Sequence, residues 1–336
     1  MKGFRRIFAV IIGMVLLLAG ILKLMDPVGA GLVMEGYLKF FHLKFLMGAA
    51  RFIAVALAML ESLVGAALMA GVWRKPVAIV SGALLAFFTV LTLVLYIGQP
   101  AMDCGCFGEA VHLTNGQTLL KNLILAVLWC AAFIPLRGNE PPQRIKYVSF
   151  SVAAVSLLLF LLYSGLSIPL RDYADFKPGT ELEEQPLYFS DASWNYADSL
   201  AMKGPVMVLS VYNAARIDEA RLAAFMGRAA ENGFQPLLLC SATPEDPGLT
   251  NPLLLSGCYF TDRRLLQTLN RSNGGATYIN DGQVIRKWAA RNLPDEAELK
   301  AVNEKAPMDY LLREQNRTRA LFQGFLLYVF AVLLLL

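Results

Sequence analysis

Two cysteines separated by one glycine form the most distinctive chemical feature of the sequence. They are Cys104 and Cys106, in the hexapeptide DCGCFG at positions 103–108. A glycine has no Cβ, so the backbone between the thiols can turn tightly enough for the sulfur atoms to approach each other. A disulfide across so short a loop is strained, and strain makes it easier to reduce. The spacing therefore predicts a transferable disulfide, with Cys104 and Cys106 as the catalytic pair of a candidate thiol–disulfide oxidoreductase.

The neighbouring residues could support thiol chemistry. Gly105 and Gly108 favour a turn, Asp103 is a candidate proton acceptor, and the ring of Phe107 could shield the sulfur atoms from water. Because the thiolate is the attacking species, a nearby base matters. His112 is a candidate for that base, and a solvated loop histidine without a catalytic role is the alternative.

Two other interpretations of this loop stay open. The cysteines could form a static disulfide or remain incidental free thiols. They could also join His112 as three ligands for copper or zinc. The chain has only 2 histidines and 5 cysteines, with no second cysteine pair nearby to complete such a set, so no metal site is predicted.

Long apolar segments must hold this loop. Hydrophobic residues make up 56% of the chain and charged residues 17%, which indicates an integral membrane protein. Runs of about 20 residues with few charges predict membrane spans, at residues 7–24, 45–72, 77–97, 119–136, 147–166 and, at the C-terminus, 321–336. No small-x-small cleavage site follows the first run, so we expect it to remain a span and not a removed signal peptide.

The basic residues predict the orientation of these spans. Lysine and arginine precede the first span and lie between spans two and three and between spans four and five, whereas the 98–117 loop has none. Lys39 and Lys44, in the first outer loop, go against this pattern. The positive-inside rule places the N-terminus in the cytoplasm of a bacterium, and the cysteine loop and residues 171–319 on the periplasmic side of the inner membrane. This topology explains most of the net charge of +4, so no nucleic-acid partner is predicted.

Residues 171–319 differ from the rest because charges occur throughout them, which predicts a soluble α/β domain. The expected strands are 205–212, 234–241, 276–279 and 283–288, and the expected helices are 218–232, 263–269 and 295–302. The last two strands flank Asn280-Asp281-Gly282, a strong hairpin signal. This order is typical of a thioredoxin-like domain, and residues 172–200 are expected to be a linker with extra edge structure.

Charged residues also occur inside the predicted spans. Arg51 and Glu61 lie in span two, with Lys23 and Asp26 at the end of span one. Intramembrane charges are functional hypotheses by default, and Glu61 could carry protons or orient a quinone headgroup. The alternative is an internal ion pair of Glu61 with Arg51 or Lys23. Small residues recur at four-residue spacing beside Glu61 and predict close helix packing, at Ser62, Ala66 and Ala70.

A resemblance to a known family rests on several of these positions together with the 103–108 loop, namely Gly20, Lys23, Asp26, Pro27, Tyr37, Arg51 and Glu61. Through them the chain resembles the MauE and DoxX-like family of bacterial membrane proteins, a four-helix membrane unit implicated in periplasmic disulfide handling. The whole layout resembles a Bacteroidetes subgroup with a degenerate thioredoxin-like tail. The resemblance implies a four-helix membrane domain at 1–140, a fifth transmembrane helix at 141–170, a thioredoxin-like domain at 171–319 and a sixth segment at 320–336.

The tail departs from redox-active thioredoxins where their chemistry occurs. The turn after the first core strand reads Tyr212-Asn213-Ala214-Ala215, where an active member carries Cys-x-x-Cys. Glycine in residues 271–275 replaces the usual cis-proline. Cys240, at a strand end, and Cys258, in an expected loop, are candidates for a structural disulfide, or else ordinary core residues.

The sequence as a whole predicts thiol–disulfide exchange between the Cys104-Gly105-Cys106 loop and the thiols of periplasmic or envelope proteins. No cofactor follows from the residues themselves. A quinone is the candidate electron acceptor, by analogy with other four-helix membrane oxidoreductases. The alternatives are a membrane scaffold that binds a partner without catalysis, and a metal-binding membrane protein.

Overall fold

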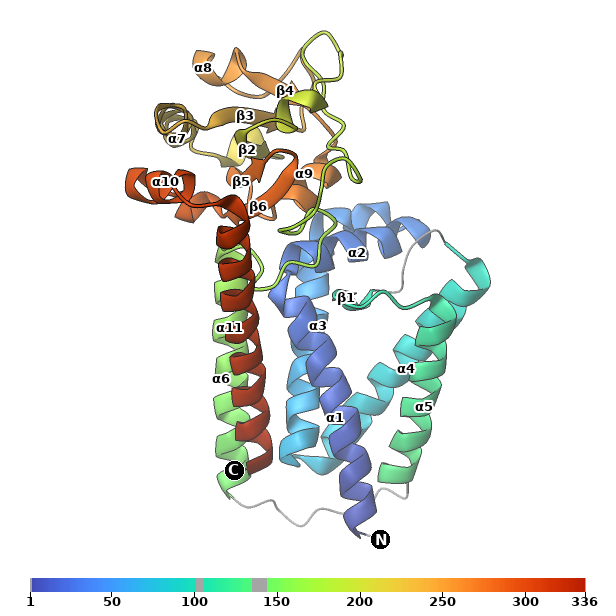
Figure 1. Ribbon diagram of the computed structural model, residues 1–336. Helices are drawn as coiled ribbons and strands as arrows, with labels where there is room; N and C mark the ends of the chain where they lie inside the picture. Colours follow the sequence, from blue (N-terminus) through green and yellow to red (C-terminus); the bar gives the residue numbers. More distant parts are fainter. Residues whose placement is uncertain (1, 101–104, 135–143, 336) are drawn as a thin grey trace. The chain divides into compact units, whose positions relative to one another are not determined.

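The computed structural model describes residues 2–100, 105–134 and 144–335 (Figure 1). Within them, 6 helices are long and apolar enough to cross a membrane. They are α1 (Lys2–Met25), α3 (Ala50–Ala70), α4 (Arg74–Gly98), α5 (Asn115–Phe133), α6 (Arg144–Leu166) and α11 (Pro307–Leu335). All the predicted spans are confirmed by length and composition, and the chain is a multi-pass membrane protein.

The chain divides into two compact units. The membrane unit comprises Met1–Ser164 and Gln323–Leu336, and the soluble unit comprises Gly165–Phe322. Helix α11 contributes to both, because it begins at Pro307 whereas the apolar run that predicts it begins at residue 321. In the membrane unit, its last turns pack on α6, where the rings of Phe160 and Phe325 stack with centroids 4.3 Å apart.

Helices α1 and α3 pack closely because small residues line their interface. A Cβ added to Gly20 would lie 2.1 Å from Ser62 Oγ, and one added to Gly65 would lie 2.5 Å from the backbone nitrogen of Leu17. These approaches leave room only for glycine, as in other membrane helix pairs. Ser62, Ala66 and Ala70 are buried, which confirms the packing face that their spacing predicts. Helix α5 packs against α1 and α4 and completes the group.

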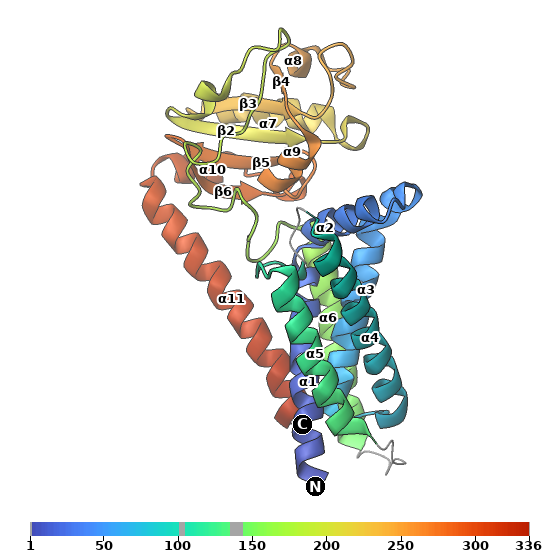
Figure 2. The same cartoon turned by 90° about the vertical axis from the view of Figure 1, so that its right-hand side faces the viewer.

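Helix α2 (Pro27–Phe40) replaces what the sequence indicated as part of an outer loop, and it lies across the ends of the long helices (Figures 1 and 2). Asp26 caps it, with Oδ1 accepting a hydrogen bond of 2.8 Å from the Gly29 amide, and Pro27 occupies its first turn. The helix has 14 residues, too few for a span. The short 3-10 helix η1 (Lys44–Ala49) connects it to α3.

The soluble unit contains a five-stranded mixed sheet with strand order β4-β3-β2-β5-β6. Its strands are β2 (Pro205–Val211), β3 (Gln235–Cys240), β4 (Cys258–Phe260), β5 (Gly275–Asn280) and β6 (Gln283–Trp288). Strand β3 is parallel to β2 and β4, and β5 is antiparallel to β2 and β6. Apolar side chains alternate along β2, so each face of the sheet has its own core. Helices α7 (Glu219–Glu231) and α10 (Glu296–Asn303) cover one face, and α9 (Arg263–Leu269) covers the other.

Most of the predicted elements of this unit are confirmed. Positive φ angles at Asp281 (46°) and Gly282 (76°) give the tight hairpin turn that the sequence predicts. Cys258 was wrongly expected in a loop, because β4 has only 3 residues and follows the four-residue helix α8 (Pro252–Leu255). Residues 172–200 add isolated bridges at both sheet edges, Glu181 to Gln283 and Ser190 to Phe260. The arrangement is consistent with a thioredoxin-like domain.

Candidate functional site

The thiol loop is a tight turn stabilised by two glycines. Gly105 and Gly108 have φ angles of 55° and 62°, a conformation that favours glycine, and the Gly108 amide donates a 3.0 Å hydrogen bond to the Gly105 carbonyl. This confirms the predicted turn and places Cys106 and Phe107 at its two central positions, at the start of β1 (Cys106–Glu109). Asp103 and Cys104 lie outside the described residues.

Neighbouring helices hold this turn in place. A Cβ on Gly105 would lie 2.4 Å from a methyl carbon of Val33 in α2. The ammonium of Lys121, in α5, lies 4.9 Å from the centroid of the Phe107 ring, a cation–π contact. Cys106 and Phe107 are half-buried, whereas His112 is exposed. The turn is therefore contacted from both α2 and α5, and its cysteine side chain is half-buried.

The intramembrane charges form an ion pair between α1 and α3. Lys23 Nζ lies 2.8 Å from both carboxylate oxygens of Glu61. The exposed fractions of the two side chains are 13% and 1%. This confirms the ion-pair interpretation with Lys23 as the partner. Arg51 is exposed in the first turn of α3, about 15 Å along the helix from Glu61, so the structure does not bring these two candidates together.

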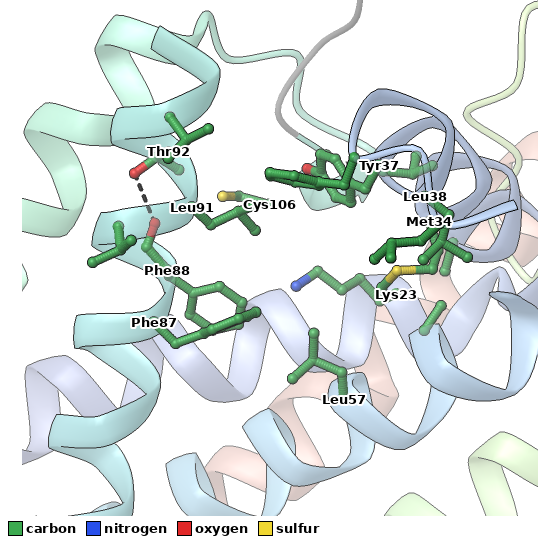
Figure 3. A pocket seen from close by; sticks show the side chains of 18 residues that line it. Lys23, Met34, Tyr37, Leu38, Leu57, Phe87, Phe88, Leu91, Thr92 and Cys106 are labelled. Carbon is green, nitrogen blue, oxygen red and sulfur yellow. Dashed lines mark hydrogen bonds between the residues drawn. The ribbon is translucent and has the colours of Figure 1, made fainter. Parts of the chain in front are cut away.

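A cavity of about 370 Å³ adjoins the thiol turn. Residues of α1, α2, α3 and α4 line it, and Lys23 is the charged residue among them. The lining is completed by Phe41, Leu43, Gly105 and Cys106. Figure 3 shows the side chains of Lys23 and Cys106 both extending into this space. Lys23 and Cys106 are predictable from the sequence as site residues. The aromatic lining from Phe87 and Phe88, and the place of Tyr37 in it, are not, since an apolar helix gives no signal of which face borders a cavity.

In the soluble unit, the side chain of Asn273 holds the turn that follows β2, at the position where the sequence comparison expects a redox motif. The amides of Tyr212 and Asn213 each donate a 2.9 Å hydrogen bond to Asn273 Oδ1. Asn273 Nδ2 in turn donates a 2.7 Å hydrogen bond to the Asn213 carbonyl. Hydrogen bonds to Asn273 therefore stabilise this turn. It contains no thiol, because its sequence is Tyr212-Asn213-Ala214-Ala215.

The two cysteines of the soluble unit are buried neighbours. Cys240 and Cys258 lie on the adjacent parallel strands β3 and β4 and belong to the same apolar core. Neither is in a disulfide. The hydrogen bond with the Cys258 thiol, and after it burial, raise the pKa of Cys240 well above its ordinary value. A thiol that stays protonated is a poor nucleophile, so this pair is suited to packing and not to exchange.

Within residues 2–100, 105–134 and 144–335, no group of three or more His, Cys, Asp and Glu side chains gathers at metal-binding distances. Of the three ligands named in the metal interpretation, Cys104 lies outside these ranges.

Fold and site together define a multi-pass membrane protein with a thiol turn beside an intramembrane cavity and an additional α/β unit. Residues 1–136 match the family model of methylamine utilisation protein MauE. The match covers the N-terminal part of the chain and agrees with the resemblance that the residues of its first spans and its DCGCFG loop predict. No curated protein and no solved structure matches the chain.

Proposed function

We propose that the protein exchanges disulfides with protein thiols at the periplasmic face of the bacterial inner membrane, through Cys104 and Cys106. The observation that carries this proposal is the position of Cys106, which a two-glycine turn places at the wall of a cavity that also receives the Lys23 ammonium. The basic cytoplasmic loops support the orientation.

The reaction needs no atoms beyond the two thiol pairs. A thiolate of the partner protein attacks the Cys104–Cys106 disulfide, and a mixed disulfide forms while one cysteine leaves as a thiolate. The second thiolate of the partner attacks the mixed disulfide. The partner leaves oxidised, and Cys104 and Cys106 become a dithiol that has gained two electrons. The soluble unit, which keeps an α/β frame without a redox motif, selects or presents the partner.

Trapping the mixed disulfide tests this proposal. Cys104→Ser and Cys106→Ser each leave one thiol, which enters a mixed disulfide by the reverse step, in which its thiolate attacks the disulfide of an oxidised partner. The second cysteine that would release the reduced partner is missing, so the mixed disulfide accumulates. We expect a reducible adduct with an envelope protein in one of the two single variants. The matched controls are the Cys104→Ser/Cys106→Ser double variant, which cannot form it, and Cys240→Ser, which removes a buried thiol of the soluble unit. Non-reducing electrophoresis and mass spectrometry detect the adduct.

The same cells separate catalysis from scaffolding. A scaffold would recruit its partner equally well in the wild-type protein and in the double variant, and the partner's disulfides would not change. Equal recruitment with no reducible adduct in either single variant would therefore overturn the exchange proposal.

A further inference from the structure

The cavity beside Cys106 lies within the membrane unit and is open to an apolar ligand. Its volume of about 370 Å³ is in the range of small-molecule sites. Two of its lining side chains, Phe87 and Val90 of α4, are 54% and 61% exposed on a helix apolar enough to span the membrane. Side chains that border both the cavity and the surface of such a helix mark an opening toward lipid. A ligand can therefore enter from the bilayer.

The lining selects a flat, mainly apolar ligand. Phe87, Phe88 and Tyr37 contribute aromatic rings, and the remaining walls are mostly aliphatic. The hydroxyl of Thr92 already donates to the Phe88 carbonyl at 2.7 Å and accepts from Asn122 Nδ2 at 3.2 Å. Its proton is therefore donated within the protein. Lys23 and Tyr37 also bring polar groups to the lining, and the Lys23 ammonium reaches into the space (Figure 3).

Within the part of the chain that the structure describes, Lys23 donates its hydrogen bonds to Glu61, and the ring of Phe88 in the cavity lining lies 5.6 Å from its ammonium. The ligand that Lys23 favours is neutral. An ammonium has three N–H donors, and two of them are directed to the oxygens of Glu61. Because Glu61 already balances the charge of Lys23, an anionic headgroup would add an uncompensated charge in a desolvated site. A neutral carbonyl oxygen can accept the third hydrogen bond without that penalty.

We propose that this cavity binds the ring of a membrane-soluble quinone, with a ring carbonyl accepting a hydrogen bond from Lys23 and the ring against Cys106. A quinone is flat, apolar and neutral, and it carries the carbonyl acceptor that the site requires. The redox role of the ligand rests on the proposed thiol exchange. The Cys104–Cys106 dithiol loses two electrons and two protons as its disulfide forms, and the quinone gains both pairs and becomes a quinol. The Lys23–Glu61 pair can pass a proton to the ring oxygen.

Filling the cavity tests the binding. The full-length protein is purified in detergent, incubated with decylubiquinone and separated from free ligand, and the retained quinone is extracted and quantified. Leu91→Trp places an indole in the lining, whereas Leu93→Trp makes the same change two residues away, at an exposed position of α4 outside the lining. We expect near-stoichiometric quinone in the wild type and in Leu93→Trp, and a loss of at least tenfold in Leu91→Trp.

Equal retention in the two tryptophan variants would overturn the inference, and so would a wild-type cavity that keeps an acyl lipid which decylubiquinone does not displace. The Lys23→Met/Glu61→Gln double variant removes the donor without leaving a buried charge, and we expect weaker retention from it as well. Binding does not need the thiols, so Cys104→Ser/Cys106→Ser should retain quinone. Quinone binding without thiol cycling would refute the exchange proposal alone, and thiol cycling without quinone binding would refute the quinone site alone.

Discussion

Each unit of the molecule holds cysteines, and their surroundings differ in every respect that governs thiol reactivity. In the membrane unit, Cys106 sits in a glycine turn at the wall of a cavity that contains a lysine ammonium. In the soluble unit, Cys240 and Cys258 are buried in a sheet core, where a thiol–thiol hydrogen bond and burial raise the pKa of Cys240. The comparison therefore supports the proposal that exchange occurs in the membrane unit and not in the α/β unit. A frame associated with thiol chemistry does not by itself identify where that chemistry occurs.

The same contrast extends to the polar groups of the two units. Asn273 fastens the turn at Tyr212 and Asn213 with three hydrogen bonds, and so uses its side chain for structure. Among the described residues, Lys23 directs two of its three donors to Glu61 and lies 5.6 Å from the ring of Phe88 in the cavity lining. A side-chain ammonium that points into a cavity can bind a ligand there. A side chain such as that of Asn273, whose hydrogen bonds go to the backbone of a turn, serves the fold.

The largest expected effect is on the rate of disulfide transfer when cysteines are removed from each unit in turn. We expect Cys106→Ser to lower the rate of disulfide transfer to a reduced peptide by about 1,000-fold or more, because the nucleophile or leaving group is lost. Cys240→Ala and Cys258→Ala should each leave that rate within about twofold, since neither thiol takes part. The rate is measured on purified protein by quenched alkylation. A comparable loss of rate in Cys240→Ala would show that thiols of the soluble unit take part in the exchange, against the proposal.

The next largest effect concerns the buried ion pair. Glu61→Gln leaves the Lys23 ammonium without its counter-charge, and we expect a loss of about 3–5 kcal/mol in the free energy of unfolding. Lys23→Met/Glu61→Gln removes both charges and should restore most of that loss. Unfolding in mild detergent measures both variants.

The ion pair also has a functional outcome. We expect Glu61→Gln to slow the reoxidation of Cys104 and Cys106, because glutamine cannot take up and release a proton as Glu61 can. If the cysteines of a folded Glu61→Gln protein were reoxidised at the wild-type rate, the Lys23–Glu61 ion pair would have a structural role only.

A smaller effect tests the packing that positions Lys23 and the turn. Gly20→Ala introduces a Cβ 2.1 Å from Ser62 Oγ, and we expect about 1–3 kcal/mol of destabilisation from overpacking between α1 and α3. Gly48→Ala is the matched control, because no atom lies within 4 Å of its added Cβ. Equal unfolding transitions in the two variants would contradict the close approach of the helices.

The smallest effect is a pH dependence in the soluble unit. The pKa of Cys240 is raised in the folded protein, so above the unfolded thiol pKa of about 8.5 the unfolded state loses a proton that the folded state keeps. Stability should therefore fall as pH rises from about 8 to 10. Cys240→Ala should show a shallower fall over the same range in equilibrium unfolding. Parallel curves for the two proteins would contradict the raised pKa.

Much of the fold follows from the sequence because its signals are long or strong. Apolar runs identify the spans, and Asn280-Asp281-Gly282 identifies the hairpin, since both patterns depend on local chemistry. Helix α2 and strand β4 were not anticipated. The former is a 14-residue helix in a glycine-rich segment, and the latter has 3 residues, which is too short for an alternating pattern.

The candidate site was predictable in its parts and not in its assembly. The DCGCFG loop identifies the turn, and intramembrane charges identify Lys23 and Glu61. Which charge pairs with Glu61 depends on the rotation of α1 against α3, and the glycine contacts of Gly20 and Gly65 set that rotation. The cavity depends on the placement of α2, which is why sequence reasoning gave no sign of it.

The most direct test of the central claim is the thiol state of Cys104 and Cys106 in intact cells. A membrane-impermeant alkylating reagent is applied before, during and after a brief pulse of reductant, and the labelled peptide is quantified by mass spectrometry. We expect the pair to be oxidised at rest, labelled after the pulse, and oxidised again once the reductant is removed, with Cys240 and Cys258 unlabelled throughout. Thiols at positions 104 and 106 that stay free, or a bond that never opens, would contradict a cycling pair at the periplasmic face.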